Sequence, residues 1–505
     1  MIKNSGILSA RRLVLLASVA GLGATILFNG GNFSPSATSN SALSSVAHAQ
    51  TVQRPVGFAD IVEKVKPAVI SVRVKLDSGA KMMGFESNSP FAPNSPMERF
   101  FRRFGMPEGT PDERPSPRNR LVTGQGSGFF ITADGYAVTN NHVVDKADTV
   151  EITTDEGKTY GAKVIGTDPR TDVALIKVEG RSDFPFVKLS DQAPRIGDWV
   201  LAVGNPFGLG GTVTAGIVSA RGRDIGAGPY DDFIQIDAPV NKGNSGGPTF
   251  DVDGNVIGVN TAIFSPSGGS VGIAFAIPAS TVKSVVAQLK DKGTVTRGWI
   301  GVQIQPVTPE IAESIGAKKT EGALVSDPQA NGPAAKAGVE AGDVITAVDG
   351  TPVKDARDLA KQIGSLAPGT SIKLSVWHKG EEKNLPVVLG ELPNQREARA
   401  TAPEHLSPNS NDVPRLGLTL APAAQVAGSG SEGVVVTKVD PSGIASEHGF
   451  QTGDVILEVG GKRVSHPGDV RSALNEAQKG GKRSVLLRVK SGDATKFVAL
   501  PLGRA

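Results

Sequence analysis

Three polar residues, far apart in the chain, have the types that nucleophilic hydrolysis needs. Ser245 lies in the glycine-rich run Gly-Asn-Ser-Gly-Gly-Pro at 243–248, His142 lies in a polar turn at 139–144, and Asp172 opens an apolar run at 172–178. A serine hydroxyl becomes nucleophilic when a histidine takes its proton and a carboxylate fixes the tautomer of that histidine. The sequence therefore predicts acyl transfer on Ser245, with His142 as the base and Asp172 as its orienting acid.

Each of these positions also has an interpretation without chemistry. Asp172 suits a turn or cap at the start of a strand, and residues 243–248 suit a plain glycine turn. The remaining histidines show no paired metal-ligand spacing, so the sequence predicts neither a metal site nor a cofactor. They are His48, His378, His405, His448 and His466.

The order of the three residues along the chain selects a fold. The run around Ser245 also fits Gly-x-Ser-x-Gly, the nucleophile turn of α/β-hydrolases, but that fold needs serine, acid and histidine in that order on a parallel sheet. Here His142 and Asp172 precede Ser245. This order is the one found in trypsin-like barrels.

The glycines beside Ser245 let the backbone approach a substrate closely and turn successive amides inward. The N–H groups of Gly243 and Ser245, on either side of Asn244, are candidates to bind the oxyanion of the tetrahedral intermediate. In trypsin-like barrels the base of the primary specificity pocket lies six residues before the nucleophile, which is Pro239 here. With Val240 and Ile263 as pocket walls, the sequence predicts cleavage after small or medium aliphatic residues, above all Val and Ala.

The elements that must position these residues are short strands. Apolar runs flank Asp134-Gly135 at 128–131 and 136–139, a hairpin signal, and further runs recur at 150–153, 172–178, 199–204, 211–219, 233–237 and 273–277. Strands at this density predict an antiparallel barrel or sandwich. A helix with its apolar face at 282–289 follows, with Ser280 as the expected cap and Gly293 as the stop, and the domain should end near residue 296.

The second half of the chain contains a repeat. The run Gly-Val-Glu-Ala-Gly-Asp-Val-Ile at 338–345 is echoed by Gly-Phe-Gln-Thr-Gly-Asp-Val-Ile at 449–456, and 322–325 is echoed by 433–436. Two copies of one module are therefore expected, joined by a flexible Pro- and Ala-rich linker at 391–414. A long insertion at 77–120 contains an aromatic cluster at 97–104, which either makes an assembly or substrate contact or collapses onto its own domain.

The amino terminus has the pattern of an export signal. Lys3, Arg11 and Arg12 precede an apolar stretch at 13–28, and Ala-His-Ala at 47–49 is a small-x-small cleavage pattern that would leave Gln50 as the first mature residue. Twin-arginine export and an uncleaved membrane anchor are the alternatives. The net charge of +3 is scattered along the chain, which argues against nucleic-acid binding, and the absence of cysteine excludes disulfides and thiolate chemistry.

Four motifs together resemble those of the Deg/HtrA (Do) serine proteases in order and spacing. They stand at 139–144, 171–174, 204–208 and 243–248, and the two repeats resemble the PDZ modules of that family. The resemblance covers the chain from about residue 57 to the carboxyl end. It implies a mainly β protein: a signal peptide at 1–49, a trypsin-like double antiparallel β-barrel at 50–296, and two α+β PDZ domains at 297–390 and 415–505. The long insertion departs from the better-known members.

The resemblance also implies binding and regulatory sites. In each PDZ module a glycine-flanked turn would capture a peptide carboxylate, beside a groove helix expected at 356–363 and at 470–474. The turn residues are Trp299, Ile300, Gly301 and Val302 in the first module and Leu416, Gly417 and Leu418 in the second. Arg223 matches the position from which peptide binding is relayed to the oxyanion turn in the family.

The function expected from these features is an ATP-independent serine endopeptidase that degrades unfolded or damaged envelope proteins. Its partners would be unfolded polypeptides and protein carboxyl termini, and by resemblance it would form trimers or multiples of trimers in the periplasm of a Gram-negative bacterium. The alternative is a periplasmic chaperone or PDZ scaffold in which hydrolysis is incidental.

Overall fold

The computed structural model describes residues 57–76, 122–147, 149–208, 210–266, 269–317, 319–393, 411–413, 416–426, 430–492 and 494–502. The predicted export segment at 1–49, the insertion at 77–120 with its aromatic cluster, and most of the linker at 391–414 lie outside these ranges. Among the helices that are described, none is both long and apolar enough to cross a membrane.

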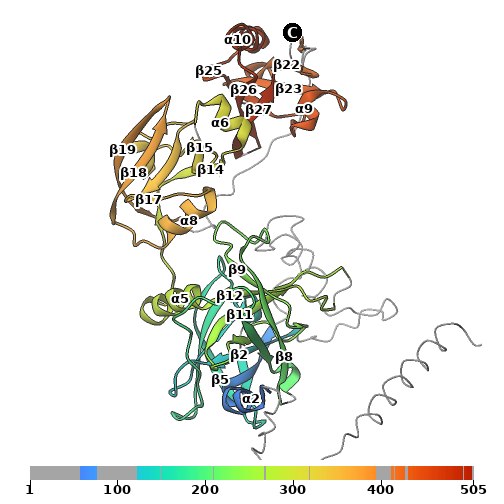
Figure 1. The fold of residues 1–505 in the computed structure, drawn as a ribbon, viewed down its shortest axis with the longest axis vertical. Coiled ribbons are helices and arrows are strands. Elements are labelled where there is room, and N and C mark those ends of the chain that lie inside the picture. The colour runs from blue at the N-terminus through green and yellow to red at the C-terminus, as the bar shows by residue number, and fades with distance from the viewer. Residues whose placement is uncertain are drawn as a thin grey trace, which may run out of the picture. The chain divides into compact units, whose positions relative to one another are not determined.

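Two closed antiparallel barrels form the first half of the described chain (Figure 1). The first has the strand order β1-β2-β3-β6-β5-β4 and the second the order β10-β11-β12-β9-β8-β7. The strands of the first barrel are β1 (Val69–Leu76), β2 (Val122–Phe130), β3 (Tyr136–Thr139), β4 (Thr149–Thr153), β5 (Thr159–Asp168) and β6 (Val173–Val178). Those of the second are β7 (Trp199–Gly204), β8 (Thr212–Arg223), β9 (Phe233–Ile236), β10 (Pro248–Phe250), β11 (Val256–Ile263) and β12 (Ala274–Pro278).

Alternation of apolar residues builds the barrel interiors. Ile70, Val72 and Val74 of β1 all enter the buried cluster inside the first barrel, because side chains two apart on a strand face the same side. The predicted hairpin is confirmed: β2 and β3 pair across a turn in which Gly135 has φ of 97°. A separate cluster joins residues of both barrels, such as Phe129 and Leu201, so a shared apolar core fixes one barrel against the other.

Helix α5 (Ala279–Lys292) closes the barrel region and packs into that shared core. Its buried positions include Val282, Val285, Val286 and Leu289, as the periodicity predicts, together with Ala279, and Gly293 ends it in the left-handed conformation with φ of 70°. The expected cap at Ser280 is wrong. The N-cap is Pro278, which has no side-chain cap bond, because strand β12 runs directly into the helix.

Two larger sheets, one for each predicted repeat, follow the barrels, beside a two-stranded sheet of β13 and β20. The first has the order β14-β15-β16-β18-β19 and the second β21-β22-β23-β24-β26-β27. The first module contains β13 (Gly298–Trp299), β14 (Val302–Pro306), α6 (Pro309–Ser314), β15 (Ala323–Pro328), α7 (Pro333–Lys336), β16 (Val344–Val348), β17 (Thr351–Pro352), α8 (Ala356–Gly364), β18 (Ser371–His378), β19 (Glu381–Val388) and β20 (Gly390–Glu391). The second contains β21 (Asn411–Val413), β22 (Leu418–Pro422), β23 (Val434–Val439), α9 (Ile444–Glu447), β24 (Val455–Val459), β25 (Lys462–Arg463), α10 (Pro467–Lys479), β26 (Ser484–Ser491) and β27 (Ala494–Pro501).

The repeated Gly-Asp pair has the same structural task in both modules. The Asp343 carboxylate accepts a hydrogen bond from the Glu340 amide at 2.8 Å, and Asp454 accepts one from the Gln451 amide at 2.9 Å. Each bond closes the turn that leads into a buried strand, β16 or β24. The sequence echo therefore marks one turn used twice.

Candidate active site

The structure brings Asp172 and His142 together at the rim of the first barrel. His142 Nδ1 lies 2.7 Å from Asp172 Oδ2, and the His142 backbone N–H donates to Asp172 Oδ1 at 3.0 Å. Asp172 is 6% exposed and stands just before β6 with φ of 57°, a conformation that Asp tolerates better than most residues. The Asn140 side chain and the Asn141 amide both donate to the Asp172 carbonyl, at 2.9 and 3.1 Å. The polar turn before β6 is thus fixed to the turn that bears the histidine.

Thr261 is a third partner of this pair, and sequence reasoning missed it. Its hydroxyl, 1% exposed, donates to Asp172 Oδ2 at 2.6 Å. Its carbonyl accepts from the Ser245 hydroxyl at 3.4 Å. Thr261 lies on β11, a strand that is buried along its whole length, so nothing in the local sequence separates it from core residues. One residue of the second barrel therefore contacts both Ser245 and the Asp172 carboxylate.

Gly126 allows Ser245 to approach the first barrel. A Cβ atom at Gly126 would lie 3.0 Å from the Ser245 carbonyl and 2.7 Å from a Val143 methyl carbon, so only glycine fits between the serine and the helix of His142. The Ser127 amide donates to the Ser245 carbonyl at 2.8 Å. Residues 126–127 of β2 thus contact the serine turn directly.

The turn at 243–247 contains the two amides predicted to bind the oxyanion. Gly243 has φ of 90°, and a Cβ there would lie 2.6 Å from Pro206, so the position needs glycine. The Asn244 amide is bound to the Asn241 carbonyl at 3.1 Å. Within the described residues the Gly243 and Ser245 N–H groups have no hydrogen-bond acceptor. These are the two amides that the sequence predicts as oxyanion donors.

The three predicted pocket residues lie in the second barrel. Val240 and Ile263 belong to one buried apolar cluster and are 3% and 7% exposed. Pro239 is exposed, and its carbonyl accepts a hydrogen bond from the Thr214 hydroxyl at 2.7 Å. Both predicted wall residues are therefore apolar and almost fully enclosed within this cluster.

A buried ion pair anchors the turn that precedes Asp172. Arg297 binds Asp168 with two hydrogen bonds of 3.0 and 2.6 Å, and the two side chains are 8% and 3% exposed. The Thr171 hydroxyl donates to the same carboxylate. The Tyr230 ring covers the guanidinium, with 4.7 Å between the carbon and the ring centre. Sequence reasoning missed this pair because its members are 129 residues apart.

The loop at 224–232 contains a buried carboxyl next to strand β11. Asp231 is 4% exposed and accepts from the Ile225 and Ala227 amides at 2.9 and 3.0 Å, both at Oδ2. These two loop residues pack on Ala262, the neighbour of Thr261. Burial and the nearby Asp224 carboxyl raise the pKa of Asp231 to about 6, against the lowering effect of the backbone donors.

The raised pKa predicts a pH-dependent stability. Between about pH 4 and pH 6 the folded chain keeps a proton on Asp231 that the unfolded chain has released, so this group makes the free energy of unfolding fall as pH rises. Asp231→Asn keeps an oxygen for both amides and should be more stable than the parent at pH 7 by on the order of 2 kcal/mol, but not at pH 4. Thermal unfolding from pH 4 to 7 measures this, with the exposed Asp253→Asn as control. An equal effect at both pH values would contradict the assignment.

The predicted carboxylate turns have the same geometry in both modules. Gly301 and Gly417 have φ of 74° and 71°. The Ile300 carbonyl accepts from the Ala334 amide at 2.8 Å, and the Leu416 carbonyl accepts from the Ala445 amide at 3.2 Å. Trp299 packs over Gly301, Val302 and Leu418 begin β14 and β22, and the expected groove helices are α8 and α10.

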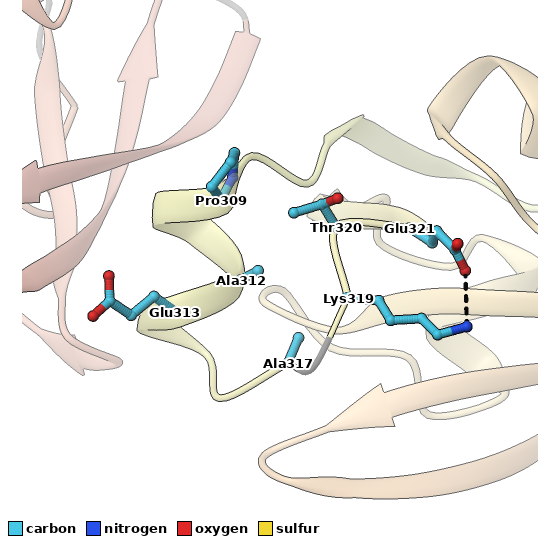
Figure 2. Close-up of a pocket in the computed structure, with 7 residues that line it drawn as sticks. All are labelled: Pro309, Ala312, Glu313, Ala317, Lys319, Thr320 and Glu321. Carbon is cyan, nitrogen blue, oxygen red and sulfur yellow. Dashed lines mark hydrogen bonds and ion pairs between the residues drawn. The ribbon is translucent and has the colours of Figure 1, made fainter.

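A separate hollow of about 510 Å³ lies in the first repeat module beside α6. Figure 2 shows Ala312 on the helix facing Thr320, with Glu313 directed away, and a Lys319–Glu321 ion pair of 3.3 Å at the rim. The full set of lining residues is Pro309, Ala312, Glu313, Ala317, Lys319, Thr320 and Glu321.

Comparison with known proteins agrees with this geometry. The family model of the trypsin-like peptidase domain matches residues 126–259, and that of the PDZ domain matches residues 298–389 and 414–502. A probable periplasmic serine endoprotease, DegP-like, from Brucella melitensis is 50% identical over 483 residues, or 92% of this chain and 93% of the relative. The chain belongs to the DegP-like serine endoproteases.

Other matches of this DegP-like chain extend the same conclusion. A DegP-like relative from Pseudomonas putida is 39% identical over 463 residues, which cover 91% of this chain and 96% of the relative. The solved structure of the HtrA-type protease AlgW with a decapeptide is 37% identical, with a TM-score of 0.55, and covers 67% of this chain and 100% of its own. The predicted fold class, two trypsin-like β-barrels followed by two PDZ domains, is confirmed.

Proposed function

We propose that this DegP-like protease cleaves peptide bonds through an acyl-enzyme on Ser245, with His142 as general base and Asp172 as the group that orients it. The observation that supports this most is the Asp172 carboxylate, which accepts hydrogen bonds from His142 and Thr261 while Thr261 also contacts Ser245. Such a buried carboxylate fixes the tautomer of the imidazole and stabilises the imidazolium that forms in the reaction.

The reaction follows from these roles. The Ser245 hydroxyl turns from the Thr261 carbonyl to the imidazole, gives up its proton to His142, and its oxygen attacks the carbonyl carbon of the scissile bond. The Gly243 and Ser245 amides bind the oxyanion, with Asn244 between them. The imidazolium then protonates the leaving amine, and a water activated by the same histidine hydrolyses the acyl-enzyme.

Specificity is the first test of the proposal. Because the proposed pocket residues Val240 and Ile263 are apolar and Pro239 carries no charge, turnover should be highest after Val and Ala, about 10-fold or more above Lys or Arg. Mass spectrometry of the fragments of reduced, denatured casein gives this preference, with Ser245→Ala as the blank. Cleavage mainly after Lys or Arg would contradict the pocket assignment.

The location of the protein is proposed from the names of its matched relatives, and the class of client proteins from the needs of a protease cleft. The matched curated relatives are named periplasmic, and we place this protein in the periplasm, exported by the segment at 1–49. The clients proposed are unfolded or damaged envelope proteins, since a protease cleft needs an extended segment that folded chains rarely present. Trimers, or multiples of trimers, are the assembly proposed by family resemblance.

Peptide binding at the PDZ turns is proposed to regulate turnover. AlgW was solved with a decapeptide and with a tripeptide, and the turns at 299–302 and 416–418 offer the corresponding backbone here. Arg223 ends β8, where it donates to Gln235 at 2.8 Å, and the adjacent Asp224 pairs with Arg357 of α8 at 3.1 Å. If Arg223 relays peptide binding, Arg223→Ala should remove stimulation by a hydrophobic carboxyl-terminal peptide and keep basal turnover; unchanged stimulation would exclude the relay.

A further inference from the structure

The side chain of Ser127 lies where the two barrels and the serine turn meet. It is fully buried, on β2, and its hydroxyl donates to the Gly243 carbonyl at 2.6 Å. The same oxygen accepts from the Asn205 amide at 2.8 Å. A buried hydroxyl that both donates and accepts holds its two partners in one geometry, because losing either bond would leave a buried polar group unpaired.

The backbone of Ser127 binds the same region. Its amide donates to the Ser245 carbonyl at 2.8 Å. Its carbonyl accepts from the hydroxyl of Thr139, the last residue of β3, at 2.7 Å. All the polar groups of Ser127 are therefore paired with the serine turn, with Asn205 or with the strand that leads to His142. The residue is a junction between the parts of the proposed catalytic site.

The hydrogen bonds of the turn fix its peptide planes one after another. The plane between Gly243 and Asn244 is held at its carbonyl by Ser127 and at its N–H by Asn241. The next plane is held at the Asn244 carbonyl by the Gly247 amide, at 3.0 Å. The N–H groups of Gly243 and Ser245 lie on either side of the Gly243–Asn244 plane, so the orientation of that plane sets the angle between the two proposed oxyanion donors.

We propose that Ser127 is a positioning residue for hydrolysis, which holds the oxyanion turn in the orientation that stabilises the tetrahedral intermediate. This inference rests on the proposed role of Ser245. Without the hydroxyl, the Gly243–Asn244 plane rotates more freely and the Asn205 amide loses its acceptor. Preorganised donors contribute to catalysis only while their geometry is fixed before the reaction.

Ser127→Ala tests the proposal, because it keeps the backbone hydrogen bonds and removes only the hydroxyl. For a fluorogenic peptide with Val before the scissile bond, kcat should fall by about 10- to 100-fold while KM changes less than twofold. The affinity for the matching peptide boronic acid, whose adduct on Ser245 is tetrahedral, should fall by a similar factor. Ser127→Cys, which fills the site with a weaker donor, should give an intermediate kcat.

Ser71→Ala is the matched control, since Ser71 is a buried serine opposite Ser127 on β1. It should leave kcat and boronate affinity unchanged. An unchanged kcat in Ser127→Ala, or equal losses in Ser127→Ala and Ser71→Ala, would overturn the proposal. Should the alanine variant not fold, Ser127→Cys replaces it: its kcat and its boronate affinity should fall by similar factors, and a kcat equal to that of the parent would overturn the proposal. Failure of the boronate to bind the unsubstituted protein would instead overturn the role of Ser245.

A second inference comes from an independent observation, the strand at residues 411–413. It lies within the segment predicted as linker, yet β21 pairs antiparallel with β22, with Val413 opposite Leu418 and Asn411 opposite Leu420. It also contacts α10. In the first module β14, the strand that corresponds to β22, is the edge of its sheet.

This pairing has the direction of a bound peptide. A PDZ ligand adds as a strand to the sheet edge, with its carboxyl end at the turn that begins that strand. Strand β21 runs antiparallel to β22, and its last residue is paired with the first residue of β22. We infer that residues 411–413 occupy the peptide groove of the second PDZ module in the free protein, so that a ligand must displace them. This inference rests on the proposed peptide binding.

Hydrogen exchange of the full chain tests this occupancy. In the unsubstituted protein the amides of β22 should be protected without peptide. Replacing residues 411–413 by three glycines should lower that protection at least tenfold, and a hydrophobic carboxyl-terminal peptide should restore it. The same replacement at 398–400 is the control. Unchanged protection of β22 in the 411–413 variant would overturn the inference, whereas a failure of the peptide to protect β14 in the unsubstituted protein would overturn the proposed peptide binding.

Discussion

Replacing Ser245 by alanine should abolish cleavage of denatured casein, with a loss in kcat of about a million-fold, to the level that binding and the oxyanion donors alone supply. The substitution removes one oxygen atom whose hydrogen bond, to the Thr261 carbonyl, is long at 3.4 Å. The melting temperature should therefore change by less than about 2 °C. Fragment analysis by mass spectrometry and thermal unfolding measure the two quantities.

The same variant separates the endopeptidase from a chaperone or scaffold. A protease with a holding function would lose cleavage and keep its suppression of aggregation of a denatured client. Cleavage by Ser245→Ala at a tenth or more of the parent rate would exclude Ser245 as the nucleophile. Ser265→Ala, a half-buried serine in the hairpin after β11, is a suitable control and should leave kcat unchanged.

The second large effect is expected at Asp172. Asp172→Asn keeps the shape of the side chain. One oxygen of Asp172 accepts from both His142 Nδ1 and the Thr261 hydroxyl, and an amide that supplies this oxygen still lacks the charge that stabilises the imidazolium. The kcat should fall by about 10,000-fold at pH 7. Steady-state kinetics with the fluorogenic peptide measures this fall.

Two observations distinguish this role from a structural one. The KM should stay within about threefold, because Asp172 does not line the predicted pocket. The exposed Asp183→Asn is the control and should behave like the parent protein. A fall in kcat of less than tenfold in Asp172→Asn would show that the carboxylate does not orient the base.

Ser245 and His142 could be selected as catalytic candidates from the sequence because each lies in a turn with a recognisable local pattern. Glycines mark the turn of Ser245, a polar turn marks His142, and the order of the residues excludes the α/β-hydrolase fold. In the structure His142 Nδ1 lies 2.7 Å from Asp172 Oδ2. The repeat predicted two modules, and two sheets of the same plan are observed.

The supporting residues lack such signatures. Thr261 lies in a strand where every residue is buried, and Ser127 lies in a glycine-rich strand, so each looks like an ordinary core position. Their contacts span 89 and 116 residues of sequence, and only the closure of both barrels brings them to the site. Pairing of that range depends on strand register, which a single local pattern does not determine.

At two other places the structure differs from what residue type and composition predict. Ser280 is a preferred capping residue type, but α5 begins earlier because β12 leads into it without a turn. The segment at 391–414 has the composition of a flexible linker, yet residues 411–413 form a strand because β22 offers an edge to pair with. In both cases a neighbouring strand decided the local structure.

The most direct test of Ser245 as a peptide-stimulated nucleophile is labelling of the full chain with a fluorophosphonate, with and without a hydrophobic carboxyl-terminal peptide. We expect one adduct per chain, located on Ser245 by peptide mapping, formed faster with the peptide and lost in His142→Ala. An adduct at another residue, or none on Ser245 while casein is still cleaved, would contradict this role.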